Sequence, residues 1–551
     1  MPKATNIDPA RLAIFDSLVA SVAEEMGATL RHTALSPNIK ERQDYSCAVF
    51  DVNGQLLAQA AHIPVHLGAM PESVGAVERL APWAPGDIAI LNDPYLGGTH
   101  LPDVTMVSPV FEQRGNRKSA QTSSPQTRQG SRRSAAQRLL GFVASRAHQA
   151  DIGGMAPGSI PVATELIQEG LIIPPVRLYR SGDLVPETLE LILRNVRTPD
   201  ERRGDLDAQV AAQRIGAQRM AALAARMGRS AFDRTAAALL DYGARIARAA
   251  IAKLPDGTYP FADALDEDGH SPEPVPIVAA LTIAGRRMHL DFTGSAPQRA
   301  ASINAVAAVT RSASYYVLRC LLPPEAPTNS GVFRPVSFTL PEGSVVNAQP
   351  PAAVAAGNVE TSQRIVDVVW GAMALALPDR MPAASSGTMN NLTAGGIDPR
   401  NGQPWAYYET SGGGLGAGPD TPGLSAAHSH MTNTLNTPAE ALELAYPLRV
   451  LENGIRRGSG GSGKQRGGDG LIRRTQFLGP ATVTIISERR TRAPWGLHGG
   501  GDGQPGRNTI ERVQPDGAIK EDHLPGKIVL PVKTGDVIRL ETPGGGGMGA
   551  Q

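Results

Sequence analysis

The sequence predicts an α+β fold, a large mixed α/β scaffold of several subdomains with a β-rich C-terminal region. Apolar residues recur at helical spacing through long segments before residue 470, with strand-like stretches between them. After Gly470, short apolar runs separated by glycine-rich turns replace the helical pattern, which is typical of strands. The chain of 551 residues also exceeds what one hydrophobic core usually holds, so we expect two or more subdomains.

The N-terminal region begins with a predicted helix, followed by a hairpin. Asp8 and Pro9 offer an N-cap and a first-turn proline. Apolar side chains then follow at helical spacing, at Leu12, Phe15, Leu18, Val22, Met26 and Leu30. We expect two short strands in CAVFDVNGQLLAQA (47–60), because its Asn53-Gly54 pair favours a tight hairpin turn.

The central part of the chain mixes helices and strands. Residues 186–253 are rich in Ala, Leu, Arg and Gln with few glycines, and they predict two or three helices. Residues 274–297 alternate as a hairpin around an Ala-Gly turn. Residues 304–322 and 359–377 are Ala-rich and apolar on more than one face, as buried helices tend to be.

The chemistry of the chain concentrates in LNDPYLGGTHLPD (91–103). His100 and Asp103 lie there, in a segment that a proline and a Gly-Gly pair must bend. A histidine and a carboxylate at i and i+3 can converge on one divalent cation as a mixed nitrogen and oxygen pair. Two ligands are too few, so a third must come from elsewhere.

The best third ligand is His148, in ASRAHQADIGG (144–154). Asp151 follows it at i+3 and a Gly-Gly pair comes next, so the two stretches repeat one pattern. A lone histidine in a surface turn more often caps backbone, but two such stretches favour a metal site. We therefore predict a divalent cation at His100, Asp103 and His148.

Other histidines and charged residues rank lower as site residues. His62 and His66 have no carboxylate beside them at ligand spacing. Glu41, Arg42 and Asp44 lie close together in the sequence, and on their own they indicate a solvated charged loop.

We divide the chain into five parts. They are an N-terminal α/β part with the candidate metal loop (1–111), a basic insertion (112–140), a helical region that continues the metal site (141–255), a central α/β region (256–470) and a β-rich C-terminal region (471–551). The insertion has seven basic residues against one acid and no apolar periodicity, which predicts a flexible segment. It lacks the interleaved aromatic residues that stack on bases, which disfavours a nucleic-acid-binding arm.

Nine stretches together carry a family resemblance. They are SPNIKERQDYSCAVFD (36–51), AHIPVHLGAMPESV (61–74), LNDPYLGGTHLPD (91–103), ASRAHQADIGGMAPGS (144–159), NVRTPDERRGDLDAQVAA (195–212), LPDGTYPFADALDEDG (254–269), GNVETSQRIVDVV (357–369), HSHMTNTLNTPAE (428–440) and RAPWGLHGGGDGQPG (492–506). The chain resembles the hydantoinase B/oxoprolinase family, which comprises N-methylhydantoinase B subunits, the C-terminal half of oxoprolinases and the alpha subunits of acetone-type carboxylases. The resemblance covers nearly the whole chain and implies that the five parts form one family domain.

The resemblance also implies a cation and its ligands. In carboxylase relatives a divalent metal is held by a His-x-x-Asp pair and a downstream histidine, which correspond to His100, Asp103 and His148 here. Two histidine ligands favour manganese or zinc over magnesium.

Four further residues are candidate catalytic residues. Asp93 or Asp151 could take a proton or orient a liganding histidine. His428 and His430 would share one face of an extended segment, because side chains alternate along a strand. We expect these two histidines to contact substrate or transfer a proton.

The predicted function is metal-assisted ring opening of a hydantoin or lactam by one subunit of an ATP-dependent cyclic-amidase complex. The resemblance implies that a hydantoinase A-type partner binds ATP and activates the carbonyl, so we expect a hetero-oligomer. GSGGSGKQ (458–465) nearly fits a phosphate-binding loop, but Gln465 stands where Ser or Thr is needed, so we do not assign ATP to this chain. Two alternatives stay open: a subunit of an acetone- or acetophenone-type carboxylase, and a non-catalytic structural subunit.

Composition argues against several other classes. A formal net charge of +1 does not indicate nucleic acid or membrane as a partner. Cys47 and Cys320 are the only cysteines, too few for a disulfide framework. The start lacks the apolar run of a secretory signal, and no stretch of eighteen apolar residues follows, so we expect a cytoplasmic protein.

Overall fold

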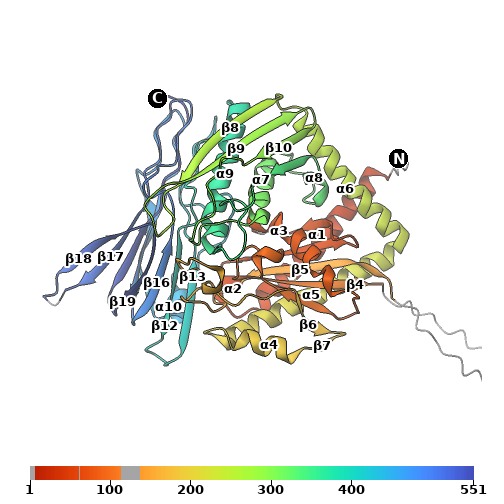
Figure 1. The fold of residues 1–551 in the computed structure, drawn as a ribbon, viewed down its shortest axis with the longest axis horizontal. Helices are drawn as coiled ribbons and strands as arrows, with labels where there is room; N and C mark the ends of the chain where they lie inside the picture. Colours follow the sequence, from red (N-terminus) through yellow and green to blue (C-terminus); the bar gives the residue numbers. More distant parts are fainter. Residues whose placement is uncertain (1–6, 61–62, 113–136, 515, 551) are drawn as a thin grey trace, which may run out of the picture.

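The computed structural model describes residues 7–60, 63–112, 137–514 and 516–550 (Figure 1). Most of the predicted flexible insertion, and His62, lie outside these described residues. The N-terminal elements (red to yellow) and the C-terminal strands (blue) occupy opposite sides of the molecule in Figure 1, and the central elements (green) lie between them and above. Helices and several sheets alternate along the chain, as expected of a mixed α+β fold.

The N-terminal sheet has seven strands in the order β2-β1-β5-β4-β3-β6-β7. Their bounds are β1 Tyr45–Asp51, β2 Leu56–Gln59, β3 Ile88–Leu91, β4 Asp103–Phe111, β5 Leu139–His148, β6 Val176–Arg180 and β7 Asp183–Leu184. β1 and β2 form the predicted hairpin around Asn53 and Gly54. β4 and β5 pair antiparallel, and this register sets Asp103 directly opposite His148.

The C-terminal edge of the predicted insertion belongs to a strand. The Glu112 N–H donates to the Arg138 carbonyl at 3.0 Å, and β5 begins at Leu139. The predicted range 112–140 therefore includes the start of a strand. The two leucines that begin β5 are too short an apolar run to recognise beside the polar, basic composition that precedes them.

Helices cover one face of this sheet and its β2 edge. Their bounds are α1 Pro9–Thr33, α4 Pro186–Leu193, α5 Pro199–Met227 and α6 Arg229–Ile251, and the last three confirm the helices expected in residues 186–253. α1 begins at Pro9, where the Asp8 side chain accepts a hydrogen bond from the Ala10 N–H at 3.1 Å. Phe15 and Met26 of α1 are fully buried, which stabilises the fold by on the order of 1.5–3 kcal/mol each. In the described ranges no helix is long and apolar enough to cross a membrane.

The opposite face of the sheet carries a polar strip. Side chains alternate along a strand, so Asp103 and Thr105 of β4 share a face with Arg146 and His148 of β5. Ser145 points the other way and accepts a hydrogen bond from the side chain of Gln213 on α5, at 2.9 Å. α3 (Ala69–Val77) lies on the side of the polar strip, where Val74 packs with Val107 and Ala144, whereas Ile39 of the short α2 (Pro37–Lys40) packs with α1 and α5. This strip is the floor of the site described below.

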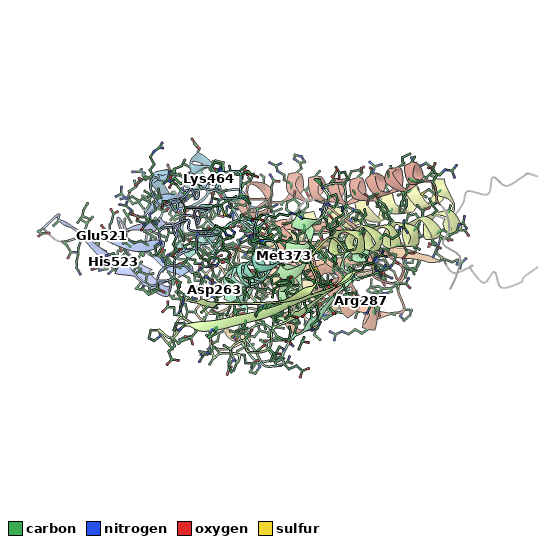
Figure 2. The ribbon with its side chains drawn as sticks, turned by 90° about the horizontal axis from the view of Figure 1, so that it is seen from above. Asp263, Arg287, Met373, Lys464, Glu521 and His523 are labelled. Atoms are coloured by element: carbon green, nitrogen blue, oxygen red, sulfur yellow. The ribbon has the colours of Figure 1, made fainter. Side chains whose placement is uncertain are left out.

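Two helices and a second sheet, all from the centre of the chain, cover the polar strip. The sheet has the order β11-β10-β9-β8, with bounds β8 Gly257–Leu265, β9 Val275–Ala284, β10 Arg287–Asp291 and β11 Val336–Thr339. The helices are α7 Ala307–Leu321 and α9 Ser362–Ala376, as expected for residues 304–322 and 359–377, and the short α8 (Ser330–Phe333) follows α7. A π-helical turn, η5 (Gly357–Thr361), runs directly into α9. α9 packs against β8 and β9, and Figure 2 shows Asp263 of β8 and Met373 of α9 near the middle of the molecule.

The C-terminal sheets join strands from both sides of residue 470. One has the order β13-β12-β16-β19 and the other β14-β15-β20-β17-β18. The bounds are β12 Asn391–Ile397, β13 Pro404–Glu409, β14 Leu448–Arg456, β15 Gly470–Phe477, β16 Ala481–Ile486, β17 Arg507–Val513, β18 Ile519–Leu524, β19 Lys527–Val532 and β20 Val537–Glu541, with α10 (Ala439–Ala445) beside β14. The β-rich tail is confirmed, but no sheet boundary falls at the expected division after residue 470. The β17–β18 hairpin reaches the far end of the molecule, where Figure 2 labels Glu521 and His523.

Glycine-rich segments between these strands pack into a bundle, which we call the glycine bundle. It comprises residues 383–386, 413–417, 459–468, 495–504 and 544–549. Successive N–H groups of its central segment donate to three different neighbours, Gly545 to Gly468, Gly546 to Ala384 and Gly547 to Gly501, at 2.8–2.9 Å. A polyproline II helix has three residues per turn, so its successive N–H groups point in three different directions, as they do here. A Cβ on Gly545 would collide with the Leu415 carbonyl, so side chains are excluded from the centre of the bundle.

The segment GSGGSGKQ (458–465) belongs to the glycine bundle. The Gly461 N–H donates to the Gly545 carbonyl at 2.9 Å, and Gln465 exchanges backbone hydrogen bonds with Met548 at 2.9 and 3.0 Å. These N–H groups bind protein carbonyls, whereas the N–H groups of a phosphate-binding loop point at the phosphate.

Candidate metal centre

The loop between β3 and β4 is bent by its glycines. Gly97 has a φ of 93°, and a Cβ at Gly98 would lie 2.7 Å from the carbonyl oxygen of Asp93. The Asn92 side chain closes the loop from inside by donating to the Leu101 carbonyl at 2.8 Å. The chain thus re-enters the sheet at the first residue of β4 with the His-x-x-Asp pair buried.

Three side chains converge at this end of the sheet, from the loop, the start of β4 and the end of β5. His100 Nε2 lies 3.1 Å from Asp103 Oδ1, and His148 Nδ1 lies 3.2 Å from the same oxygen. Each residue offers one ligand atom, and these atoms lie within 4.8 Å of one another. All three residues are at most 2% exposed. The structure therefore brings together the three residues that the sequence predicts as ligands.

The cluster fits a cation better than a hydrogen-bond network. Nε2 of His148 is buried without a hydrogen-bond partner in the described part of the chain, and the buried Nε2 of His100 meets Asp103 Oδ1 without the geometry of a hydrogen bond. A buried polar atom without a partner costs free energy, which a metal-ligand bond would offset. A cavity of about 20 Å³ adjoins the three side chains, enough for one small ion or water.

The protonation states also suit a cation. Burial would raise the pKa of the Asp103 carboxyl, but the neighbouring His100 and His66 outweigh it and hold that pKa well below its usual range. Burial lowers the pKa of His148 below its ordinary value. A carboxylate anion and a neutral imidazole are the forms that bind a metal.

The aromatic wall of the site comes from β13. The Tyr408 ring stacks on His148 with centroids 4.4 Å apart, and the Arg42 guanidinium lies 4.6 Å from the centroid of Tyr408. Arg42 is fully buried and donates to Asn38 Oδ1 at 2.6 Å, and Asp44 is 7% exposed. The solvated loop expected around Arg42 is therefore wrong. The pattern of charges could not reveal a partner more than 360 residues away.

Three residues that sequence reasoning missed or ranked low hold the second oxygen of Asp103. Thr99 Oγ1 donates to Oδ2 at 2.6 Å, His66 Nε2 lies 3.3 Å from it, and Asn358 Nδ2 donates at 3.4 Å. His66 ranked low because no carboxylate stands near it in the sequence. Asn358 lies in the π-helical turn, a feature often found at functional sites.

Asp93 and Asp151 are not part of this cluster. Asp93 accepts the Tyr95 N–H at 3.0 Å and lines a different cavity, of about 690 Å³. Asp151 is fully buried, where it pairs with the Arg197 guanidinium at 2.7 Å and accepts the Arg197 N–H at 2.7 Å. Both carboxylates are engaged away from the ligands.

His428 and His430 do not share a face, because His430 has a φ of 56° and the segment is not extended there. His430 Nε2 lies 3.4 Å from Asp367 Oδ1. Burial lowers the pKa of His428 to about 4, and its Nε2 has no hydrogen-bond partner within the described ranges. Met431 and Thr432, which follow in the chain, line the cavity at the three ligands.

A buried carboxyl, Glu169, supports the backbone beneath His100. Its Oε1 accepts the N–H groups of Val354 and Ala355 at 2.9 and 2.8 Å, and the Ala355 carbonyl lies 3.4 Å from His100 Nδ1. Burial raises the pKa of Glu169 to about 8. Its other oxygen bonds to no residue that the structure describes, which agrees with a neutral carboxyl.

We expect Glu169→Gln to raise stability at alkaline pH. The folded-state pKa of about 8 exceeds the ordinary value of 4.5, so the unfolded chain ionises first and stability falls as pH rises from about 4.5 to about 8. Glutamine keeps the acceptor oxygen and cannot ionise. Thermal unfolding should give nearly equal Tm values at pH 5 and a Tm about 1–3 °C higher for the variant at pH 8.5. Equal destabilisation at both pH values would contradict a neutral Glu169, and the exposed Glu273→Gln serves as control.

Comparison with known sequences gives one family over nearly the whole chain. A family described as Hydantoinase B/oxoprolinase matches residues 8–551. An uncharacterized protein of Methanocaldococcus jannaschii is 40% identical, over 99% of this chain and 91% of that protein. 5-oxoprolinase 1 of Arabidopsis thaliana is 36% identical over 98% of this chain and 42% of that protein, so the chain spans about two fifths of its length. A protein of Pseudomonas sp. (strain NS671) that is named as the B-type subunit of a D-/L-hydantoinase is 30% identical, over 98% of this chain and 90% of that protein.

Two solved structures share the fold. The crystal structure of ATP-dependent caprolactamase from Pseudomonas jessenii aligns with a TM-score of 0.87 and 28% identity, over 99% of this chain and 92% of that one. A nucleotide-free acetone carboxylase aligns with a TM-score of 0.87 over 100% and 76%, but at 20% identity this likeness shows the fold alone.

Proposed function

The chain belongs to the hydantoinase B/oxoprolinase family, and we propose that it is the metal-bearing subunit of an ATP-dependent cyclic amidase of the N-methylhydantoinase or 5-oxoprolinase type. One observation carries the proposal. His100, Asp103 and His148 form a buried group that could hold a cation, and the Nε2 atoms of both histidines find no hydrogen-bond partner among the described residues.

The chemistry required is attack on an unreactive carbonyl. The nitrogen of a cyclic amide donates into its carbonyl, so ring opening needs an activated carbonyl and a strong nucleophile. A cation bound at this centre would supply both, by polarising an oxygen and by lowering the pKa of water.

The residues of this chain prepare the centre in two ways. Asp103 supplies the one negative charge, and His148 stays a neutral nitrogen donor because it is buried. Tyr408 and Met431 close the side of the centre and exclude bulk water, which strengthens electrostatic interactions there.

The cavity beside His100, Asp103 and His148 is too small to admit a substrate. A cavity of about 20 Å³ is far below the roughly 300–1,000 Å³ of ordinary small-molecule pockets. Among the residues that line it, Met431 and Thr432 belong to an irregular segment between β13 and α10. We propose that this segment moves when substrate binds.

We also propose a partner of the hydantoinase A type that binds ATP and activates the carbonyl. Two observations support it. One relative is named as the B-type subunit of a hydantoinase, and the plant 5-oxoprolinase is more than twice as long as the segment that matches this chain. The unmatched length of such single-chain relatives would correspond to the partner.

The proposal predicts ATP-dependent activity for the pair and almost none for this chain alone. Both chains are co-purified and incubated with ATP and a panel of hydantoins, 5-oxoproline, caprolactam and ketones, the ketones with and without bicarbonate. We expect ring opening coupled to ATP hydrolysis for at least one cyclic amide. Bicarbonate-dependent turnover of a ketone would instead establish the carboxylase alternative, and full activity of the isolated partner would make this chain structural.

A further inference from the structure

We propose that His66 is a positioning residue that, together with Ser46, commits Asp103 to bind the cation through one oxygen only. The proposal rests on the metal centre proposed above and goes beyond its three ligands. It assigns a role to a histidine that lies outside the ligand set.

The two oxygens of Asp103 face different partners. Oδ1 faces Nε2 of His100 and Nδ1 of His148, at 3.1 and 3.2 Å. Oδ2 instead meets Thr99, His66 and Asn358, at 2.6, 3.3 and 3.4 Å. An oxygen that already accepts three hydrogen bonds has no lone pair directed at a cation, so Oδ1 remains as the ligand atom.

His66 is fixed from its other side by Ser46. The Ser46 hydroxyl lies 2.8 Å from His66 Nδ1, and both residues are at most 1% exposed. Ser46 of β1 pairs with Arg146 of β5, which lies two residues before His148. Ser46 is therefore part of the polar strip, next to the pair of Asp103 and His148. A hydroxyl that donates to Nδ1 leaves Nε2 as the N–H, and this N–H then points at Asp103.

His66 is not a fourth ligand. It does not belong to the group of residues whose ligand atoms lie within 4.8 Å of one another in the described part of the chain. Its Nε2 meets Oδ2 of Asp103, whereas His100 and His148 face Oδ1. Cation binding therefore depends on Ser46 and His66 only because they orient the carboxylate of Asp103. Loss of such a supporting contact commonly weakens metal affinity by about 10–100-fold.

The test measures metal binding, not activity. Full-length His66→Leu, His66→Gln and Ser46→Ala proteins are titrated with Zn²⁺ against a chelator, and their Co²⁺-loaded forms are compared by visible absorption. Glutamine can place an amide N–H where His66 Nε2 stands, whereas leucine cannot. Ser46→Ala removes one hydroxyl only, so it reports on the series even if leucine disturbs folding. His270→Ala, an exposed histidine remote in the sequence from the ligands, is the control.

We expect His66→Leu to bind one ion about 10–100-fold more weakly than the wild type. Its Co²⁺ absorption should weaken, because Oδ2 then keeps only Thr99 and Asn358 as donors, and the lone pair that His66 held can bind the cation and raise the coordination number. His66→Gln should recover most of the affinity, and Ser46→Ala should lose a few-fold.

Two results would overturn the inference while the metal centre stands. One is a His66→Leu protein with the affinity and Co²⁺ spectrum of the wild type. The other is a His66→Gln protein as weak as His66→Leu, since a ligand or a packing role would then explain His66 better. A wild-type chain that binds no transition metal is a different result, because it would remove the proposed centre itself.

Discussion

Asp103→Ala is expected to abolish metal binding and to lower ATP-dependent turnover of the reconstituted pair by at least about 10³-fold. Asp103 is the residue that both ligand histidines face, at 3.1 and 3.2 Å, and it supplies the only negative charge of the ligand set. Its loss also leaves the donors of His66, Thr99 and Asn358 without their buried acceptor. Elemental analysis and coupled ATP hydrolysis measure the two effects separately.

Controls distinguish loss of the cation from loss of the fold. Asp103→Asn keeps the shape of the side chain and should still lose the metal, because the charge is gone. Asp207→Ala removes an exposed carboxylate of α5 and should change neither metal content nor turnover. A folded Asp103→Ala protein that retains about one metal ion per chain would exclude Asp103 as a ligand.

Gly545→Val is expected to prevent stable folding, with a loss of more than about 4 kcal/mol. A Cβ at this position would collide with the carbonyl oxygen of Leu415 and lies against backbone, which cannot rotate away as a side chain can. The Gly545 N–H also donates to Gly468 at 2.9 Å, so a backbone shift that relieved the collision would break this bond. Soluble yield and thermal unfolding measure the effect.

A matched glycine outside the glycine bundle tests whether close packing in the bundle causes the loss of stability. Gly454 lies on β14, where an added Cβ meets nothing within 4 Å. Gly454→Val should therefore keep the wild-type Tm within a few degrees. If Gly545→Val unfolded at the same temperature as Gly454→Val, the central segment would not be packed as described.

Periodicity predicted the elements whose partners are close in the sequence. The Asn53-Gly54 hairpin and the helix after Asp8 form as expected, since local turn and capping chemistry decides them. The repeated His, Asp and Gly-Gly pattern also singled out Asp103 and His148, which the structure brings together. β4 begins at Asp103 of the first copy and β5 ends at His148 of the second. Because these neighbouring strands are antiparallel, the two residues lie opposite each other.

Residues whose partners are distant in sequence could not be predicted. His66 meets its carboxylate 37 positions later, and Arg42 is buried by Tyr408 from a different sheet. The prediction that His428 and His430 share one face is wrong, because the left-handed backbone at His430 interrupts the alternation of side chains along an extended segment.

The glycine-rich segments show a different limit. Runs such as residues 458–465 have the composition of flexible loops, yet here they form a packed bundle. Packing of this kind depends on having no side chains, so neither hydrophobic periodicity nor propensity can signal it. Only the meeting of several glycine-rich segments in space makes the bundle stable.

The central claim is that one divalent cation binds among His100, Asp103 and His148, and anomalous X-ray diffraction tests it most directly. A crystal of the manganese- or zinc-loaded protein is measured at the absorption edge of that metal. We predict one strong anomalous peak about 2.0–2.2 Å from a nitrogen of each histidine and from Oδ1 of Asp103. Well-ordered side chains at these positions without a peak between them, or a peak bound only by other residues, would contradict the account.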